Sequence, residues 1–221
     1  MQIIPELSFT MTKVPTIESR DYHDYVIKDG KMVGRFEEMY RNCENPWPET
    51  EDDLDFLPTS SRTPVIINHY GYKRIFSVGS GKGMHLNWLL KKCPQIKAEG
   101  CEVSPTAVEI CRKNFPKINT HVMDVAEFPK HDFDFDLILI RETIWYFLDH
   151  WQSFCNHLKE KYKGRHIIVE LSFYDNQSYG TNFFDGPDEF VARFPFEVIE
   201  IVRHHVTDKQ REGMIFVYGK I

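Results

Sequence analysis

The sequence predicts an α/β protein with one mostly parallel sheet and helices on both of its faces. Short apolar runs rich in β-branched residues alternate with segments of helical spacing, which is the pattern of successive β/α units. The five expected strands lie near residues 74–78, 97–101, 118–123, 135–140 and 165–171. Two further runs, 196–206 and 214–218, are joined by a short polar loop, and so short a connection makes them an antiparallel hairpin.

The size of the chain suits a single domain. With 221 residues, of which 42% are hydrophobic, it is long enough to bury a sizeable core over residues 1–221. Residues 1–72 are expected to form an N-terminal lid or helical segment, and 73–221 the sheet. We see no apolar run of about 18 residues that would span a membrane. The first residues also lack the basic and then apolar pattern of a secretory signal.

Charge and cysteine content narrow the class of function. The formal net charge of −6 argues against a general nucleic-acid binder, because such proteins need a basic surface to meet phosphates. The five cysteines are scattered and odd in number, which favours reduced thiols in a cytoplasmic protein over a disulfide framework. No metal site is expected either, because no cluster of carboxylates or C-x-x-C spacing is evident.

The N-terminal part holds two expected helices. Helical spacing appears around Phe36, Met39 and Tyr40, before the turn ENPWPE, and a second helix is expected within residues 56–72. The acidic run between them, residues 49–55, is interpreted as a solvated loop.

The most informative stretch is RIFSVGSGKG, in which an apolar strand ends in three glycines at alternate positions. Glycine permits positive φ and lets a ligand lie close against the backbone, so this is a ligand-binding turn. A dinucleotide fingerprint would need glycine where Met84 stands, and a P-loop would need Ser or Thr where Gly83 follows Lys82.

Acidic residues close the next two strands. A helix expected over residues 84–92 leads to a strand that ends in Glu102, where a carboxylate is placed to accept hydrogen bonds from ribose hydroxyls. Ser104 and Pro105 then have the pattern of an N-cap and a first helical residue. The third strand is closed by Asp124.

The turn G-x-G-x-G, with these acids in this order, resembles motif I and its downstream motifs in class I S-adenosylmethionine-dependent methyltransferases of the small-molecule or sugar-modifying type. The resemblance covers residues 74–219 and implies a Rossmann-like, seven-stranded sheet of order 3-2-1-4-5-7-6 with an antiparallel last strand. It also implies S-adenosylmethionine as cofactor and S-adenosylhomocysteine as product. One position departs from the family, since Ser77 stands where an acid is usual, two residues before the first glycine.

The resemblance also assigns cofactor-binding residues. The turn is expected against the amino-acid end of the cofactor, the second strand end at the ribose, the third at the adenine, and the fourth beside the methionine part, with an N-terminal aromatic as cover. In that order these residues are Gly79, Ser80, Gly81 and Gly83; Glu102 and Val103; Asp124 and Val125; Arg141; and Tyr40.

The acceptor side is expected just after the fourth strand, in the segment RETIWYF. Methyl transfer is an in-line displacement, so the protein mainly has to align the acceptor and exclude water, with a general base for some acceptors. Glu142 and Tyr146 are the candidates for orienting the acceptor or removing its proton. The alternative is that Glu142 merely caps the following helix, while Trp145 and Phe147 pack the core. A long aromatic loop after the fifth strand, from about residue 173 to 190, is expected to border the substrate.

The function predicted on this basis is methyl transfer to a small polar metabolite, with a sugar among the candidates and the acceptor atom (O, N or C) open. The protein is expected to be a monomer or homodimer that binds neither nucleic acid nor membrane. Two alternatives remain. One is a catalytically idle scaffold of the same fold, which the serine at position 77 favours. The other, a nicotinamide-dependent oxidoreductase, is disfavoured by the glycine spacing and the terminal hairpin.

Overall fold

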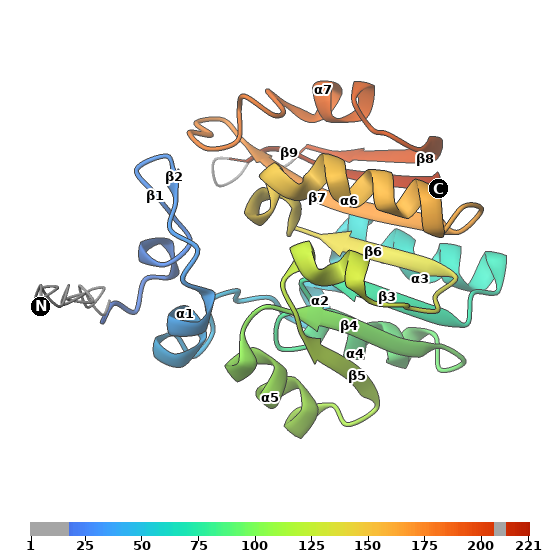
Figure 1. Ribbon diagram of the computed structural model, residues 1–221, viewed down its shortest axis with the longest axis horizontal. Coiled ribbons are helices and arrows are strands. Elements are labelled where there is room, and N and C mark those ends of the chain that lie inside the picture. Colours follow the sequence, from blue (N-terminus) through green and yellow to red (C-terminus); the bar gives the residue numbers. More distant parts are fainter. Residues whose placement is uncertain (1–17, 206–210) are drawn as a thin grey trace, which may run out of the picture.

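A seven-stranded sheet forms the centre of the computed structural model, which describes residues 18–205 and 211–221. Its strands lie in the order β5-β4-β3-β6-β7-β9-β8 (Figure 1). In chain order they are β3 (Arg74–Val78), β4 (Lys97–Glu102), β5 (Ile118–Val122), β6 (Leu137–Arg141), β7 (His166–Tyr174), β8 (Glu197–His204) and β9 (Arg211–Lys220). Numbered from β3 as the first strand, this is the order 3-2-1-4-5-7-6, so the predicted fold class is confirmed.

The strand register brings the functional segments to one edge of the sheet. β3 to β7 pair in parallel, whereas β9 is antiparallel to both β7 and β8, as the terminal hairpin predicts. Val78 at the end of β3 lies opposite Cys101 on one side and Ile140 on the other. The segments after β3, β4 and β6 therefore emerge side by side at the carboxyl edge, which is where ligands bind in open α/β sheets.

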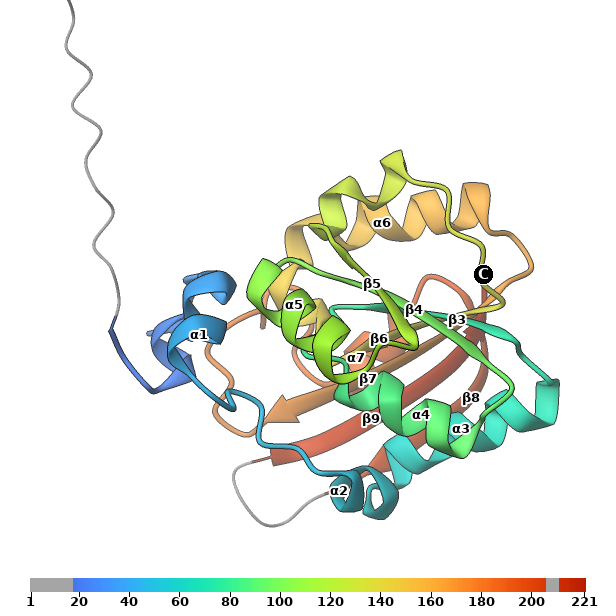
Figure 2. The same ribbon diagram turned by 90° about the horizontal axis from the view of Figure 1, so that it is seen from below.

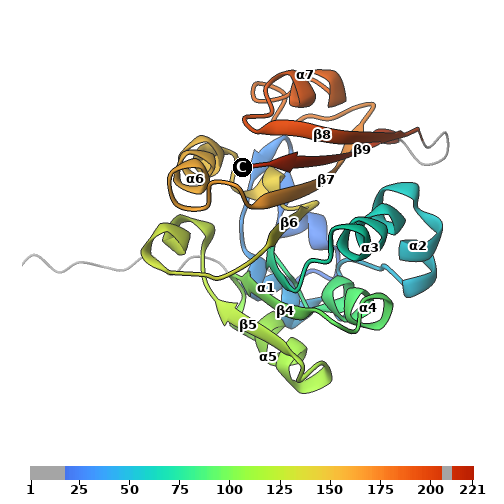
Figure 3. The same ribbon diagram turned by 90° about the vertical axis from the view of Figure 1, so that its right-hand side faces the viewer.

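Helices cover both faces of the sheet (Figure 3). They are α3 (Pro58–Tyr70), α4 (Met84–Lys92) and α5 (Pro105–Asn114) on one face, and α6 (Leu148–Lys161) with α7 (Pro187–Ala192) on the other. The central strand β6 shows why two layers are needed. Leu137 and Leu139 belong to the apolar cluster beneath α3 and α4, whereas Ile138 and Ile140 belong to the cluster beneath α6. A continuous apolar run is thus buried on both faces, as parallel strands require.

The N-terminal part lies beyond the carboxyl edge of the sheet (Figures 1 and 2). It contains the short helix η1 (Tyr22–Asp24), the two-residue strands β1 (Ile27–Lys28) and β2 (Lys31–Met32), and helix α1 (Phe36–Asn42), which confirms the helix expected there. Glu37 fastens α1 to the start of α5. Its carboxylate accepts hydrogen bonds from the Ser104 hydroxyl (2.6 Å) and from the Thr106 backbone N–H (3.1 Å) and hydroxyl (2.8 Å).

The acidic run is a helix, and its interpretation as a solvated loop is wrong. Residues Glu51–Phe56 form α2, which begins with a capping box between Thr50 and Asp53. The Thr50 hydroxyl accepts from the Asp53 N–H at 3.2 Å, and the Asp53 carboxylate accepts from the Thr50 N–H at 2.8 Å. Three acidic residues in the first turn also suit the positive end of the helix dipole. The run of acidic side chains therefore marks the start of a helix.

Two further findings concern the cysteines and the possibility of a membrane-spanning helix. The five cysteines are all buried free thiols. In the part of the chain that the structure describes, no helix is long and apolar enough to cross a membrane.

Candidate active site

The glycine turn after β3 is shaped by close packing. Gly79 and Gly83 have φ of 67° and 83°, a region that residues with a Cβ rarely adopt. A Cβ on Gly79 would overlap the Thr143 side chain, and one on Gly83 would overlap the Cys111 sulfur. The turn is therefore wedged between the segment after β6 and helix α5, and Gly83 is the N-cap of α4.

Glu102 joins this turn to the end of β4. Its side chain is 6% exposed, and its two oxygens accept hydrogen bonds from the Gly81 N–H (3.0 Å) and the Ser104 N–H (3.1 Å). Burial raises the pKa of Glu102, although these backbone donors favour its charged form. A carboxylate has about four acceptor sites, and the backbone N–H groups of Gly81, Val103 and Ser104 interact with it, so it keeps capacity for a further hydrogen bond. The arrangement suits a vicinal diol, as the sequence predicts for a ribose.

Two polar atoms beside the turn have no partner within residues 18–205 and 211–221. They are the Ser80 hydroxyl and His85 Nε2, and both atoms are buried. Burial first, and then the charge of Arg141, lowers the pKa of His85 well below its usual value, so the imidazole is neutral. Buried polar groups without hydrogen bonds are rare, and a ligand with polar groups at the turn would supply the missing partners. These residues therefore fit a cofactor lying on the turn.

Asp124 and Val125 follow β5, beside the end of β4, because the Met123 N–H donates to the Glu102 carbonyl at 3.0 Å. The Asp124 carboxylate accepts from the Ala126 N–H at 2.8 Å and starts the short helix η2 (Val125–Lys130). Val103, after β4, is 40% exposed. The structure thus brings the ribose and adenine candidates to neighbouring strand ends.

Tyr40 covers the glycine turn from the N-terminal part. Its hydroxyl lies 3.1 Å from where a Cβ on Gly81 would stand, and it accepts a hydrogen bond from the Trp47 indole at 3.0 Å. Burial first, and then the charge of Glu102, raises the pKa of Tyr40, which keeps the phenol neutral. Lys82 also binds the N-terminal part, since its ammonium donates to the Glu44 carbonyl at 2.7 Å.

Arg141, at the end of β6, links the N-terminal part to the sheet through Glu49. The guanidinium donates to the Glu49 carboxylate through both terminal nitrogens, and its Nε donates to Glu170 at 3.2 Å. Glu170 is 1% exposed and also accepts from the hydroxyls of Ser60 (3.0 Å) and Thr63 (3.2 Å). The Arg141 side chain thus has two carboxylate partners already. Glu49 was missed in the sequence, because nothing in its spacing relates it to a residue 92 positions later.

Glu142 has a backbone conformation that is unusual for its residue type. Its φ is 53°, and a non-glycine residue in this region is strained, which is most often seen at functional sites. Its carboxylate accepts from the Ser172 N–H (3.0 Å) and hydroxyl (2.7 Å) on β7, so the interpretation of Glu142 as a helix cap is wrong. Loss of hydration raises the pKa of Glu142, and the charge of Arg141 and the Ser172 bonds only partly oppose this.

Tyr146 lies in a group of aromatic rings that we call the aromatic cage. Its ring centroid is 5.1 Å from that of Phe36 and 6.1 Å from that of Trp47, and the Trp47 ring is 4.6 Å from that of Tyr22. Tyr40 completes the cage through its hydrogen bond to Trp47. Burial first, and then the charge of Glu142, raises the pKa of Tyr146 well above its usual value. The two predicted acceptor residues therefore lie within electrostatic reach of each other. Trp145 and Phe147 pack in the core, as the alternative interpretation proposes.

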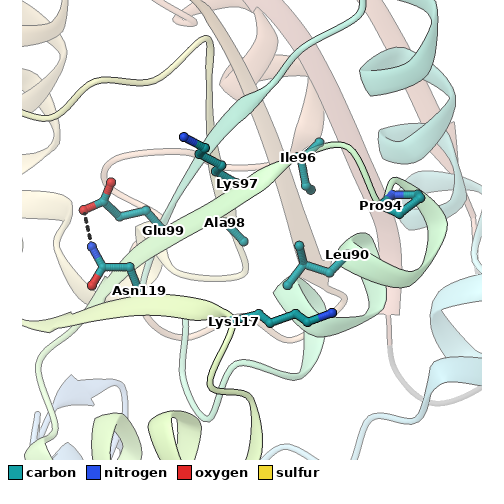
Figure 4. Close-up of a pocket in the computed structure, with 8 residues that line it drawn as sticks. All are labelled: Leu90, Pro94, Ile96, Lys97, Ala98, Glu99, Lys117 and Asn119. Carbon is teal, nitrogen blue, oxygen red and sulfur yellow. Dashed lines mark hydrogen bonds between the residues drawn. The ribbon is translucent and has the colours of Figure 1, made fainter.

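A separate surface groove of about 430 Å³ lies far from this site (Figure 4). It is lined by Leu90, Pro94, Ile96, Lys97, Ala98, Glu99, Lys117 and Asn119. These residues surround the amino ends of β4 and β5, whereas the glycine turn follows the carboxyl end of β3. The groove carries no residue of the candidate site.

Comparison with known proteins gives one family-model match, which covers part of the chain. Residues 75–164 match the family model described as a methyltransferase domain. No curated protein has a significant sequence match to the chain.

Solved structures share the fold at low identity. The N-methyltransferase NodS from Bradyrhizobium japonicum, in complex with S-adenosyl-L-homocysteine, is 14% identical with a TM-score of 0.55, over 80% of this chain and 92% of that chain. The methyltransferase domain of bacterial CtHen1 is 15% identical with a TM-score of 0.58, over 78% and 100% of the two chains. The plantazolicin methyltransferase BpumL is 13% identical with a TM-score of 0.57, over 80% and 88%. Within residues 75–164 the chain thus matches a methyltransferase domain, and its fold, including the strand order, is that of the solved methyltransferase structures.

Proposed function

We propose that this chain transfers a methyl group from S-adenosylmethionine to a small polar metabolite, with sugars among the candidates. The observation that carries the cofactor assignment is Glu102, whose buried carboxylate is bonded to the Gly81 N–H of the glycine turn and keeps acceptor capacity for a ligand hydroxyl. When bound, S-adenosylmethionine supplies an electrophilic methyl group on a positively charged sulfur. The structures of NodS and BpumL that contain S-adenosylhomocysteine support this choice of cofactor.

The proposed cofactor residues have distinct tasks. Glu102 holds the ribose hydroxyls, with Val103 beside it, and Asp124 accepts from the adenine amino group while the Val125 N–H donates to the ring. The glycine turn with Ser80 receives the amino-acid end. Tyr40 closes the site from above, and its contact with the turn at Gly81 supports this role. Arg141 acts through its ion pair with Glu49, which holds the cover against the sheet.

The acceptor residues align the nucleophile. Glu142 and Tyr146 follow β6 directly, so they lie one strand away from the glycine turn after β3. Both side chains are partly buried, and Tyr146 packs against Phe36 and Trp47 of the N-terminal part, which supports a site that limits water and favours the in-line geometry of methyl transfer. A small acceptor is supported by this enclosure. The printed names of the similar structures do not share an acceptor, so the fold leaves the acceptor open.

Other features of the proposal rest on composition. A single domain over residues 1–221 is supported by the contacts that join α1 to α5 and Glu49 to Arg141. The net charge of −6 supports an acceptor other than nucleic acid. Five free thiols support a reducing, cytoplasmic location. We propose a monomer or homodimer.

A catalytically idle scaffold is the second candidate, and Ser77 is the observation that favours it. This residue is 4% exposed on β3, at the position where the family usually has an acid. Calorimetric titration with S-adenosylhomocysteine, with NAD⁺ as control, separates the candidates. Micromolar binding of S-adenosylhomocysteine alone is expected of the enzyme. Absence of binding to either ligand would favour the scaffold, and binding of NAD⁺ alone would favour an oxidoreductase.

A further inference from the structure

The candidate acceptor site has more negative than positive charge. Arg141 is its one guanidinium in the described chain, and it is shared between Glu49 and Glu170. Glu142 forms no direct ion pair within residues 18–205 and 211–221. Its carboxylate accepts hydrogen bonds from the neutral Ser172, and the nearby charge of Arg141 is already shared with Glu49 and Glu170. A partly desolvated carboxylate without a direct cation partner is costly, so Glu142 can receive one.

The aromatic cage includes Tyr146, which follows Glu142 by four residues. Its rings come from two parts of the chain, with Tyr22, Phe36, Tyr40 and Trp47 in the N-terminal part and Tyr146 after β6. The faces of such rings carry negative charge density and attract ammonium groups, most strongly where water is excluded. The same group of rings reaches the glycine turn through Tyr40. Through Tyr146 the cage is also within electrostatic reach of Glu142, so it has contacts toward both the glycine turn and that carboxylate.

We propose that the methyl acceptor is an amine, which binds as an ammonium ion between the Glu142 carboxylate and the rings of Trp47 and Tyr146. This inference rests on the proposed methyltransferase function and adds the chemical class of the acceptor. A sugar satisfies it when it carries an amino group.

Neither a neutral alcohol nor the sulfonium explains the site as well. A hydroxyl acceptor would leave Glu142 with only the charge of Arg141 nearby, which is shared with Glu49 and Glu170. Pairing Glu142 with the sulfonium would stabilise the ground state more than the transition state, because the sulfonium charge is dispersed as the methyl group leaves. An amine nitrogen instead gains positive charge during the transfer, and the aromatic faces then stabilise the transition state.

The proposed reaction is balanced within the site. The Glu142 carboxylate takes a proton from the ammonium group, which leaves a neutral amine and a neutral carboxylic acid. The nitrogen lone pair then forms the N–C bond as the C–S bond breaks, and the sulfur keeps the electron pair of that bond. The product is a methylated ammonium ion, and Glu142 returns its proton to solvent. The raised pKa of Glu142 makes it a stronger base than an ordinary carboxylate.

The test uses the full chain saturated with S-adenosylhomocysteine and two matched pairs of probes at pH 7. Glucosamine is compared with glucose, and benzylamine with benzyl alcohol, by calorimetric titration. We expect the amine of at least one pair to bind ten times more tightly than its hydroxyl partner. Glu142→Gln is expected to remove this preference while leaving the affinity for S-adenosylhomocysteine unchanged. Glu160→Gln, an exposed carboxylate on α6, is the control and should keep the preference.

The outcomes separate this inference from the proposed function. If S-adenosylhomocysteine binds but neither amine is preferred, or no amine binds at all, the amine acceptor is wrong and the methyltransferase assignment stands. A preference that survives in Glu142→Gln would overturn the role of that carboxylate. If the native protein does not bind S-adenosylhomocysteine, the proposed function itself is wrong.

Discussion

Replacement of Glu102 by glutamine tests the cofactor site most directly. In the native protein, one carboxylate oxygen accepts from the Gly81 N–H at 3.0 Å and the other from the Ser104 N–H at 3.1 Å. A glutamine amide has one oxygen and one NH₂ group, so one of these backbone donors would face another donor. The remaining acceptor capacity for ribose hydroxyls would also be halved and would lose its charge.

The size of the effect follows from these contacts. A hydrogen bond to a charged group contributes about 1.5–3 kcal/mol, and two such bonds to ribose hydroxyls are weakened or lost. A total loss of roughly 3 kcal/mol corresponds to about a 150-fold higher Kd for S-adenosylhomocysteine. The effect on folding is smaller, because the unsatisfied N–H costs about 1–3 kcal/mol while removal of a buried charge offsets part of that cost.

The assay is calorimetric titration of S-adenosylhomocysteine, with thermal unfolding measured on the same samples. Glu99→Gln is the matched control, because Glu99 is on the same strand but bonds His121 and Asn119 near the amino end of the sheet. We expect the Glu99 variant to bind like the native protein. A change of less than about threefold in the Glu102 variant, or an equal loss in both variants, would refute the ribose assignment.

Three further predictions concern the supports of the site. Gly83→Ala should lower the free energy of unfolding in urea by at least about 2 kcal/mol, because φ is positive and the new Cβ would overlap Cys111; an unchanged midpoint would contradict this packing. Glu49→Gln should speed dissociation of S-adenosylhomocysteine roughly fivefold, since a partly buried ion pair with Arg141 is worth about 1 kcal/mol. Release at the native rate in a stopped-flow experiment would show that this ion pair does not hold the cofactor site closed. Asp136→Asn should lower the free energy of unfolding by about 2 kcal/mol at pH 7, and this difference between native and variant protein should shrink below about pH 4. Urea unfolding at both pH values measures it.

The sign of the last prediction follows from the pKa of Asp136. Burial raises it, but the Arg74 guanidinium and the backbone N–H groups of Lys73 and Arg74 outweigh burial, so the folded-state pKa is lowered. A carboxyl with a lowered pKa stabilises the fold above its unfolded-state pKa, near 3.9, and this contribution is lost as the pH falls through the folded-state value. A pH-independent difference between native and variant protein would contradict the ion pairing.

Most of the helices and strands could be predicted from local sequence patterns. Strand and helix positions in the β/α units follow from short-range periodicity, and the short loop before β9 allowed only an antiparallel hairpin. The helix α2 was missed although its signal was local, because the acidic run was interpreted by charge and the spacing of Thr50 and Asp53 was overlooked.

By itself the sequence determined the strands, the glycine turn and the position of Glu102 at the end of β4, because each depends on neighbours within a few residues or on one β/α unit, whereas the strand order was implied by the family resemblance. Tertiary structure alone decided the pairing of Glu49 with Arg141, the bonds from Ser172 to Glu142 and the assembly of the aromatic cage. The physical reason is that these contacts join segments far apart in the chain. Their geometry depends on strand register, on one strained φ and on where the N-terminal cover docks, and none of these leaves a periodic trace in the sequence.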